Sequence, residues 1–151
     1  MKRGLILSLI LVLMIMVVGC GKKQKTMICS ISGTNAEGRE YSNEYVIKYT
    51  GDYVDELKIT EKIKSDNQTY LNTLKKAVET EAKPFKDIKY YDYDVEIKGN
   101  EIIAHRTVNY KKIDTDALIK ASSANKALIK DGKVKLDDIK KLYESYNFKC
   151  E

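Results

Sequence analysis

The sequence predicts an α+β domain: an antiparallel β-sheet, built from two hairpins and an N-terminal strand, packed on one face by two to three helices. Residues 41–63 and 91–110 alternate apolar with polar side chains, and a glycine-containing pair interrupts each stretch. Alternation with one polar face indicates strands that are covered on a single side. Residues 68–82 and 136–146 repeat apolar side chains at helical spacing and can supply that cover.

The N-terminal part of the domain is predicted to be a strand followed by a hairpin. The strand is expected over 27–32, and the loop over 33–39 is rich in Gly, Thr and Asn. Gly51-Asp52 is typical of a tight hairpin turn between two alternating runs. The apolar face of this hairpin carries Tyr41, Tyr45, Ile47, Tyr49, Tyr53, Leu57, Ile59 and Ile63.

A helix is predicted over 68–82. Ser65 and Gln68 have the spacing of a capping box at its start, and Pro84 prevents its continuation. The helix is amphipathic, and we expect its apolar stripe to cover the 41–63 hairpin. The stripe consists of Leu71, Leu74, Ala77 and Val78.

The second hairpin is predicted over 91–110, with its turn at Gly99-Asn100. In its second strand Arg106 shares a face with apolar residues, whereas His105 lies on the other face beside Ile103. Apolar residues on both faces predict a central strand or a partly covered outer face.

The C-terminal part is predicted to be helical. Asp114 is a suitable N-cap for a helix that includes Leu118, and Asp131-Gly132 is expected to end or turn that segment. A second amphipathic helix is predicted over 136–146, with one apolar face. That face carries Ile139, Leu142, Tyr143 and Tyr146.

The first 19 residues have the parts of a secretory signal peptide, with a short cationic start and an apolar run from Leu5 to Val18. This run is short for a bilayer span, which takes roughly 20 apolar residues. The ending Val17-Val18-Gly19-Cys20 resembles a bacterial lipobox. The resemblance implies cleavage before Cys20 and a diacylglycerol thioether on it; the alternative is an uncleaved membrane anchor.

Cleavage would leave a basic tether over 20–26 and a single domain over 27–151. Its lysines are expected to attract anionic headgroups, at about 1 kcal/mol each. Loss of residues 1–19 lowers the basic count from 27 to 25 against 22 acids, so the net charge is +3. This mild charge does not indicate a nucleic-acid partner. The expected location is the extracytoplasmic side of the cell membrane, with the lipid bilayer as a partner.

Two cysteines remain once Cys20 is assigned to lipid. Cys29 and Cys150 lie near the two ends of the predicted domain. Thiols are not kept reduced outside the plasma membrane, which favours a structural disulfide over two free thiols. The bridge would stabilise the fold by about 4–5 kcal/mol in the chain-entropy model.

The layout as a whole resembles a known family. A lipobox, a cysteine just after the tether, two Tyr-rich hairpins separated by one helix and a helical C-terminus are similar to the YehR-like lipoproteins, the DUF1307 family. The resemblance implies an α+β fold with an antiparallel sheet and a bacterial cell-envelope location. It implies no activity and no functional residues.

The tyrosine-rich sheet face is the main candidate for a function. With no Trp and two Phe in the chain, tyrosine can simply fill the core beneath the helices. Alternatively, part of the face is open and binds a protein or a small molecule through hydroxyl-edged aromatics. The candidate binding residues are Tyr41, Tyr45, Tyr49, Tyr91 and Tyr93.

Catalytic and metal motifs are scarce. His105 is the only histidine, and neither Gly-x-Ser-x-Gly nor His-Glu-x-x-His occurs. Asp92, Asp94 and Glu96 share a strand face, but carboxylates two residues apart are about 7 Å from each other, which favours a solvated face over a metal site. We therefore expect no metal and no cofactor. The sequence favours a non-enzymatic binding domain; the alternative is a small hydrolase or lipid- or glycan-handling enzyme that uses His105 with Asp92 or Asp94.

Overall fold

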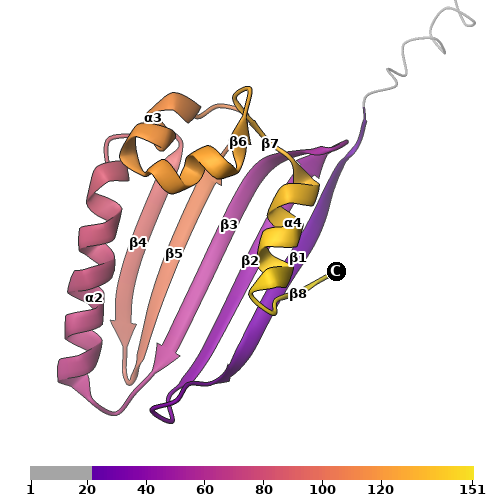
Figure 1. Cartoon of the computed structure of the whole chain (residues 1–151). Helices are drawn as coiled ribbons and strands as arrows, with labels where there is room; N and C mark the ends of the chain where they lie inside the picture. Colours follow the sequence, from indigo (N-terminus) through magenta and orange to yellow (C-terminus); the bar gives the residue numbers. More distant parts are fainter. Residues whose placement is uncertain (1–21) are drawn as a thin grey trace, which may run out of the picture.

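The computed structural model describes residues 22–151, which form a six-stranded sheet with helices on one side (Figure 1). The predicted signal peptide and Cys20 lie outside the described residues. In chain order the elements are β1 (Gln24–Thr34), β2 (Glu40–Thr50), β3 (Tyr53–Lys64), α2 (Gln68–Ala82), η1 (Lys83–Phe85), β4 (Tyr91–Lys98), β5 (Glu101–Asn109), α3 (Thr115–Ala121), η2 (Ser123–Ala127), β6 (Ile129–Lys130), β7 (Lys133–Val134), α4 (Leu136–Ser145) and β8 (Lys149–Cys150). The predicted α+β class and both predicted hairpins are confirmed.

The strand order is β4-β5-β3-β2-β1-β8, and all neighbours are antiparallel. The β4–β5 hairpin pairs through β5 with β3, so β5 is an internal strand, as its two-sided apolar pattern predicted. We call the side that carries the helices the helix face and the other side the free face. One row of register partners crosses the helix face from β1 to β4: Cys29, Tyr45, Ile59, Arg106 and Tyr93.

Two separate clusters of buried side chains lie on the helix face. The larger contains fourteen buried residues from the sheet, α3, the β6–β7 hairpin and α4, including Leu118 and Ile139. The smaller contains only Leu71 of α2 with Val95 and Ile102 of the β4–β5 hairpin. We call the two regions the α4 half and the α2 half. In Figure 1, α2 runs along the β4 edge and α4 lies over β1 and β2, with α3 at one end between them.

The expected cover of the first hairpin by helix 68–82 is wrong. The helix has the predicted bounds, but it packs on the β4–β5 hairpin, because that hairpin lies on the far side of β3 from β2. Tyr45 is instead covered by Tyr143 of α4 and by Phe148, whose ring centroids lie 4.8 and 4.7 Å from that of Tyr45. The C-terminal chain therefore covers the first hairpin, which helix 68–82 was expected to cover.

Three local expectations also need correction. Asn67, and not Ser65, caps α2: its side chain accepts from the Tyr70 amide, while Ser65 Oγ accepts from the Asn67 amide. The first strand begins at Gln24 and so takes in part of the predicted tether. Tyr146 was expected on the apolar face of the last helix, but it is 62% exposed because α4 ends at Ser145 and the chain then turns away.

A β-bulge explains the exposure of Tyr53, which was expected on the apolar face. The register between β2 and β3 shifts after Lys48, so that Tyr49 pairs with Val54 and Asp55 is the extra residue. Val54 is consequently buried, whereas Tyr53 is 40% exposed. The bulge resets the alternation by one residue at the start of β3.

The predicted disulfide is confirmed. Cys29 and Cys150 are register partners on β1 and β8, and their Cα atoms are 4.0 Å apart. The neighbouring pair, Ile28 and Glu151, exchanges both backbone hydrogen bonds. Cys29 and Cys150 are therefore a non-hydrogen-bonded pair, the type whose Cα atoms lie closer together in an antiparallel ladder. The bridge thus fixes the end of the chain to the edge of the sheet.

Candidate functional site

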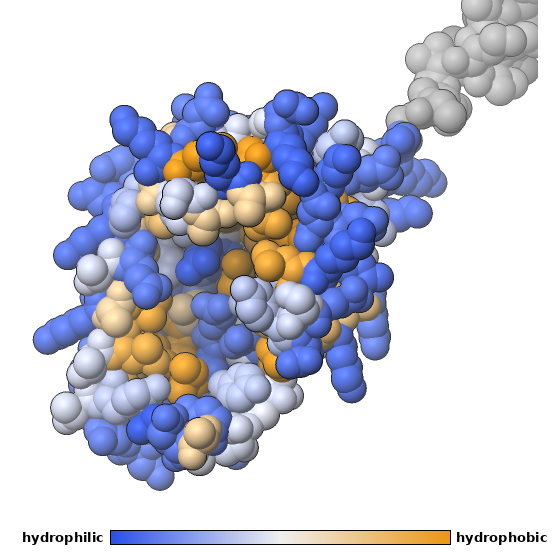
Figure 2. Space-filling view, in the orientation of Figure 1, coloured by the Kyte–Doolittle hydropathy of each residue, from blue (hydrophilic) through white to orange (hydrophobic). Residues whose placement is uncertain are grey.

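A groove lies on the helix face where the two halves of the molecule meet. Figure 2 shows a hollow with a hydrophilic centre between apolar regions on either side. The cavity has a volume of about 460 Å³, within the range of small-molecule sites. Leu57, Ile59, Arg106 and Val108 of the sheet line it, and the surrounding wall comes from α2, η1, α3, η2 and α4.

The wall of the groove is mainly apolar and aromatic. Phe85 of η1 stacks on Tyr91 of β4, with ring centroids 4.8 Å apart and planes 14° apart. Leu118 of α3 and Ile139 of α4 also line the groove. Pro84 lies within η1, directly after the end of α2, and Phe85 follows it. Such surfaces bind the apolar part of a ligand.

Among residues 22–151, Arg106 is the one cation that lines this cavity. It lies in the middle of the row that crosses the sheet, between Ile59 and Tyr93. None of the ion pairs within residues 22–151 involves Arg106. Its Nε atom is shielded from solvent and has no hydrogen-bond partner among the same residues. A guanidinium held in this way can accept an anionic partner at low cost in further desolvation.

Glu61 lies two residues after Ile59 on β3, and its carboxylate is already engaged. Tyr45 donates its hydroxyl to Glu61 Oε1 at 2.8 Å. Burial, followed by the charge of Glu61, raises the pKa of the Tyr45 hydroxyl far above its usual value. Tyr45 therefore stays protonated and keeps donating to Glu61.

The Tyr93 hydroxyl, like Arg106 Nε, is shielded from solvent and has no hydrogen-bond partner in the described chain. Burial raises the pKa of Tyr93 to about 12, although the charge of Arg106 opposes this shift. Burial likewise raises the pKa of Tyr91, again against the nearby Arg106 guanidinium. Both hydroxyls are therefore neutral donors at physiological pH.

The five tyrosines of the candidate binding face separate into two groups. Tyr45 is buried, and Tyr49 packs against the same α4 cluster, so both belong to the core. Tyr91 and Tyr93 are half-buried and border the groove or the adjoining hollow. Tyr41 is half-buried beside Gly33 at the other end of the sheet. Of these five, Tyr91 lines the groove with Arg106, and Tyr93 lines the adjoining hollow.

His105 lies on the free face. It is exposed, its partners in register are Thr60 and Asp94, and its Nδ1 is 3.2 Å from Thr60 Oγ1. Asp92 and Asp94 are exposed on the same face. These residues, on which the predicted enzymatic alternative depended, are thus on the side of the sheet opposite to the groove.

Other reactive spacings are also outside the groove. Ser123 and Lys126 have a Ser-x-x-Lys spacing, but both are exposed on η2. Glu96 pairs with Lys98, and no group of three or more metal-ligating side chains occurs between residues 22 and 151.

Asp55 is a buried polar residue that the sequence did not reveal. It is 4% exposed, and it accepts hydrogen bonds from Gln24 at 2.8 Å and Thr50 at 2.6 Å. Lys111 Nζ lies 3.0 Å away. Burial alone would raise the pKa of Asp55, but the hydrogen bonds and the ammonium outweigh it and lower the pKa below its usual value. The carboxylate joins β1, β2 and the segment after β5, so its role is structural.

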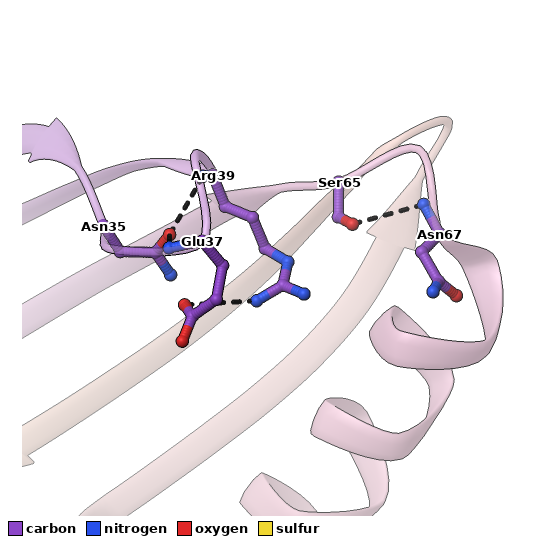
Figure 3. A network of polar contacts seen from close by, with 5 residues as sticks. All are labelled: Asn35, Glu37, Arg39, Ser65 and Asn67. Atoms are coloured by element: carbon purple, nitrogen blue, oxygen red, sulfur yellow. Dashed lines mark hydrogen bonds and ion pairs between the residues drawn. The ribbon is translucent and has the colours of Figure 1, made fainter.

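The two ends of the sheet differ in their side chains. At the end where the described chain begins, Lys89 and Lys112 approach the ring of Tyr90, and Lys133 approaches that of Tyr53. At the opposite end, Figure 3 shows Asn35 accepting from the Glu37 and Arg39 amides, and Arg39 pairing with Glu37. Arg39 also stacks on Tyr70 of α2, with its guanidinium carbon 3.9 Å from the ring centroid. The second network is a loop and helix-cap assembly.

Comparisons with known proteins show a fold and no function. The sequence matches no protein-family model and no curated protein. The NMR structure of the E. coli YehR protein is similar over 86% of this chain and 92% of its own, with 21% identity and a TM-score of 0.60. The NMR structure of a protein from Streptococcus pneumoniae TIGR4 is similar over 85% and 86%, with 12% identity and a TM-score of 0.56. The chain therefore has a YehR-like fold. Within residues 22–151 no helix is long and apolar enough to span a membrane.

Proposed function

We propose that this chain is a lipid-anchored, extracytoplasmic binding protein that holds a small ligand in the groove on its helix face. The observation that carries the proposal is Arg106, a guanidinium that lines an otherwise mainly apolar cavity and takes part in none of the ion pairs within residues 22–151. Isolated charges are rarely left in such surroundings without a partner, because their desolvation is not repaid. A ligand that occupies the groove would supply the missing interaction.

The anchor is supported by sequence and by the start of the fold. The lipobox-like ending at Cys20 stands only four residues before Gln24, where β1 begins. Four residues span at most about 14 Å, so a lipid on Cys20 would hold this end of the sheet near the bilayer. The lysines and exposed tyrosines at this end are the residue types that suit a headgroup region.

The groove can be tested with a neutral, environment-sensitive dye. Nile red should bind the wild-type mature chain saturably, because its apolar body fits the Phe85 and Leu118 walls. Ala121→Phe places a ring in the cavity and should weaken this binding at least tenfold. Ala77 was expected on the apolar stripe of α2 but is exposed, so Ala77→Phe is the matched control and should bind like the wild type. Equal binding by both variants would contradict a groove site.

The anchor can be tested independently in cells. Cys20→Ala removes the only thiol to which the lipid can be attached and should release the protein from membranes or stall its processing. Membrane fractionation with mass spectrometry of the N-terminus measures both outcomes. A processed Cys20→Ala chain that stays in the membrane fraction would refute lipid anchoring.

A further inference from the structure

We propose that the ligand of the groove is an amphipathic monoanion, with a carboxylate on Arg106 and an apolar body against the Phe85–Tyr91 stack. This inference rests on the proposed binding function and specifies the ligand class. It follows from three features of the groove: unsatisfied donors, the balance of charge and the apolar wall.

The first feature is a pair of unsatisfied donors on adjacent strands. Arg106 and Tyr93 are direct register partners on β5 and β4, so their Cβ atoms are about 5 Å apart. Arg106 Nε and the Tyr93 hydroxyl are both shielded from solvent without a hydrogen-bond partner in residues 22–151. Buried donors nearly always have acceptors in native proteins. A carboxylate has two acceptor oxygens and can accept from the Arg106 side chain, which lines the groove.

The second feature is the charge of the site, which limits the ligand to one negative charge. Of the residues that the structure describes, only Arg106 and Glu81 bring a charge to the lining of the groove. Glu61 adds another acid nearby, since it accepts from Tyr45 in the next row of the sheet. Arg106 can compensate one negative charge of a ligand, whereas the second charge of a phosphate dianion would meet only the carboxylates of Glu81 and Glu61, which repel it.

The third feature is an apolar extension from the charged centre. The Phe85–Tyr91 stack and Leu118 line the cavity that contains Arg106. A second hollow of about 360 Å³, lined by Tyr93, shares Ala82 and Tyr91 with it. A ligand whose carboxylate lies on Arg106 can therefore place an alkyl or aromatic body along this wall.

The test compares decanoate with decanol and decyl phosphate, using the mature chain from Cys20 onward without lipid. Binding is followed by NMR shifts of backbone amides in β4 and β5. Decanoate should bind at least about tenfold more tightly than either analogue, the fold-change expected for a hydrogen-bonded charge. Arg106→Gln should weaken the binding of decanoate by the same factor and leave the binding of decanol unchanged. Lys58→Gln removes a positive charge from the free face and should change neither.

The possible failures are distinguishable. Undiminished decanoate binding by Arg106→Gln would overturn the ligand class, and so would a preference for decyl phosphate. In either case, Nile red binding that is weakened by Ala121→Phe would still support the proposal that the groove binds a ligand. Absence of binding by Nile red and by all three probes would refute both proposals. Wild-type-like amide spectra for Arg106→Gln in the absence of ligand verify that the variant is folded.

Discussion

The two halves of the helix face are held together by different means. In the α4 half, fourteen buried residues and the Cys29–Cys150 bridge bind the C-terminal chain to the sheet. In the α2 half, one helix contributes a single fully buried leucine to a cluster of three. The sheet carries two separate clusters, and Arg106 lies between Ile59 of the larger cluster and Tyr93, which packs against the smaller one. The groove is therefore a consequence of how the helices divide the sheet.

The disulfide should give the largest difference between the halves. Replacing Cys29 and Cys150 by Ser removes a crosslink between residues 121 apart, which should lower the free energy of unfolding by about 4–5 kcal/mol. Chemical denaturation of the double variant and the wild type measures this change. Hydrogen exchange should show β8 and α4 losing protection first, with α2 little affected. Equal loss of protection in α2 would show that the two halves form one cooperative unit.

Tyr45→Ser and Leu74→Ala compare the packing of the two halves directly. Tyr45 is buried between Tyr143 and Phe148, so losing its ring should cost about 3–5 kcal/mol. Leu74 is only half-buried in the α2 half, and its truncation should cost less than about 2 kcal/mol. Thermal melts of both variants provide the comparison, with Tyr45→Phe as a control that removes only the hydrogen bond to Glu61. A Tyr45→Ser melt like that of the wild type would mean that this face is an open surface.

How the sheet is divided could be predicted only in part from the sequence. Alternation located the hairpins, helical spacing gave the bounds of α2, and the cysteine count gave the bridge. The predicted packing partner of α2 was wrong because local pattern does not specify strand order. The β4–β5 hairpin pairs with β3, and α2 packs on that hairpin. The bulge at Asp55 was missed because it breaks the alternation by one residue without a glycine to mark it.

The candidate site was harder to predict for a related reason. Sequence placed Arg106 on the apolar face of a central strand, and that was correct. An arginine in such a position could have been paired by any of several acids, and only the tertiary structure shows that none pairs with it within the described chain. His105 attracted the enzymatic hypothesis because it is the only histidine, yet it lies on the free face.

Asp55→Asn tests whether the bulge supports the α4 half. The substitution keeps the size but removes the charge that Lys111 and the hydrogen bonds from Gln24 and Thr50 stabilise, and it should cost about 1–3 kcal/mol at pH 7. The pKa of Asp55 is lower in the folded than in the unfolded state, so its contribution exists above the unfolded pKa and disappears as pH falls through the folded pKa. Denaturation curves should therefore differ at neutral pH and converge once the pH falls below the folded-state pKa of Asp55. A difference in the free energy of unfolding that does not change with pH would indicate that Asp55 acts through packing and not through its charge.

Arg106→Met should have the smallest effect on stability, and its sign is the informative part. The guanidinium is partly desolvated at the boundary of the two halves and unpaired within residues 22–151, so an apolar side chain of similar length should stabilise the domain by up to about 1 kcal/mol. Arg106→Lys keeps the charge, and it should show no such gain. Paired thermal melts of the two variants measure the difference. Destabilisation by Arg106→Met would mean that the arginine supports the fold, for instance through the field it exerts on Glu61. Stabilisation would mean that the sheet retains a residue which weakens it, as expected of a position selected for binding.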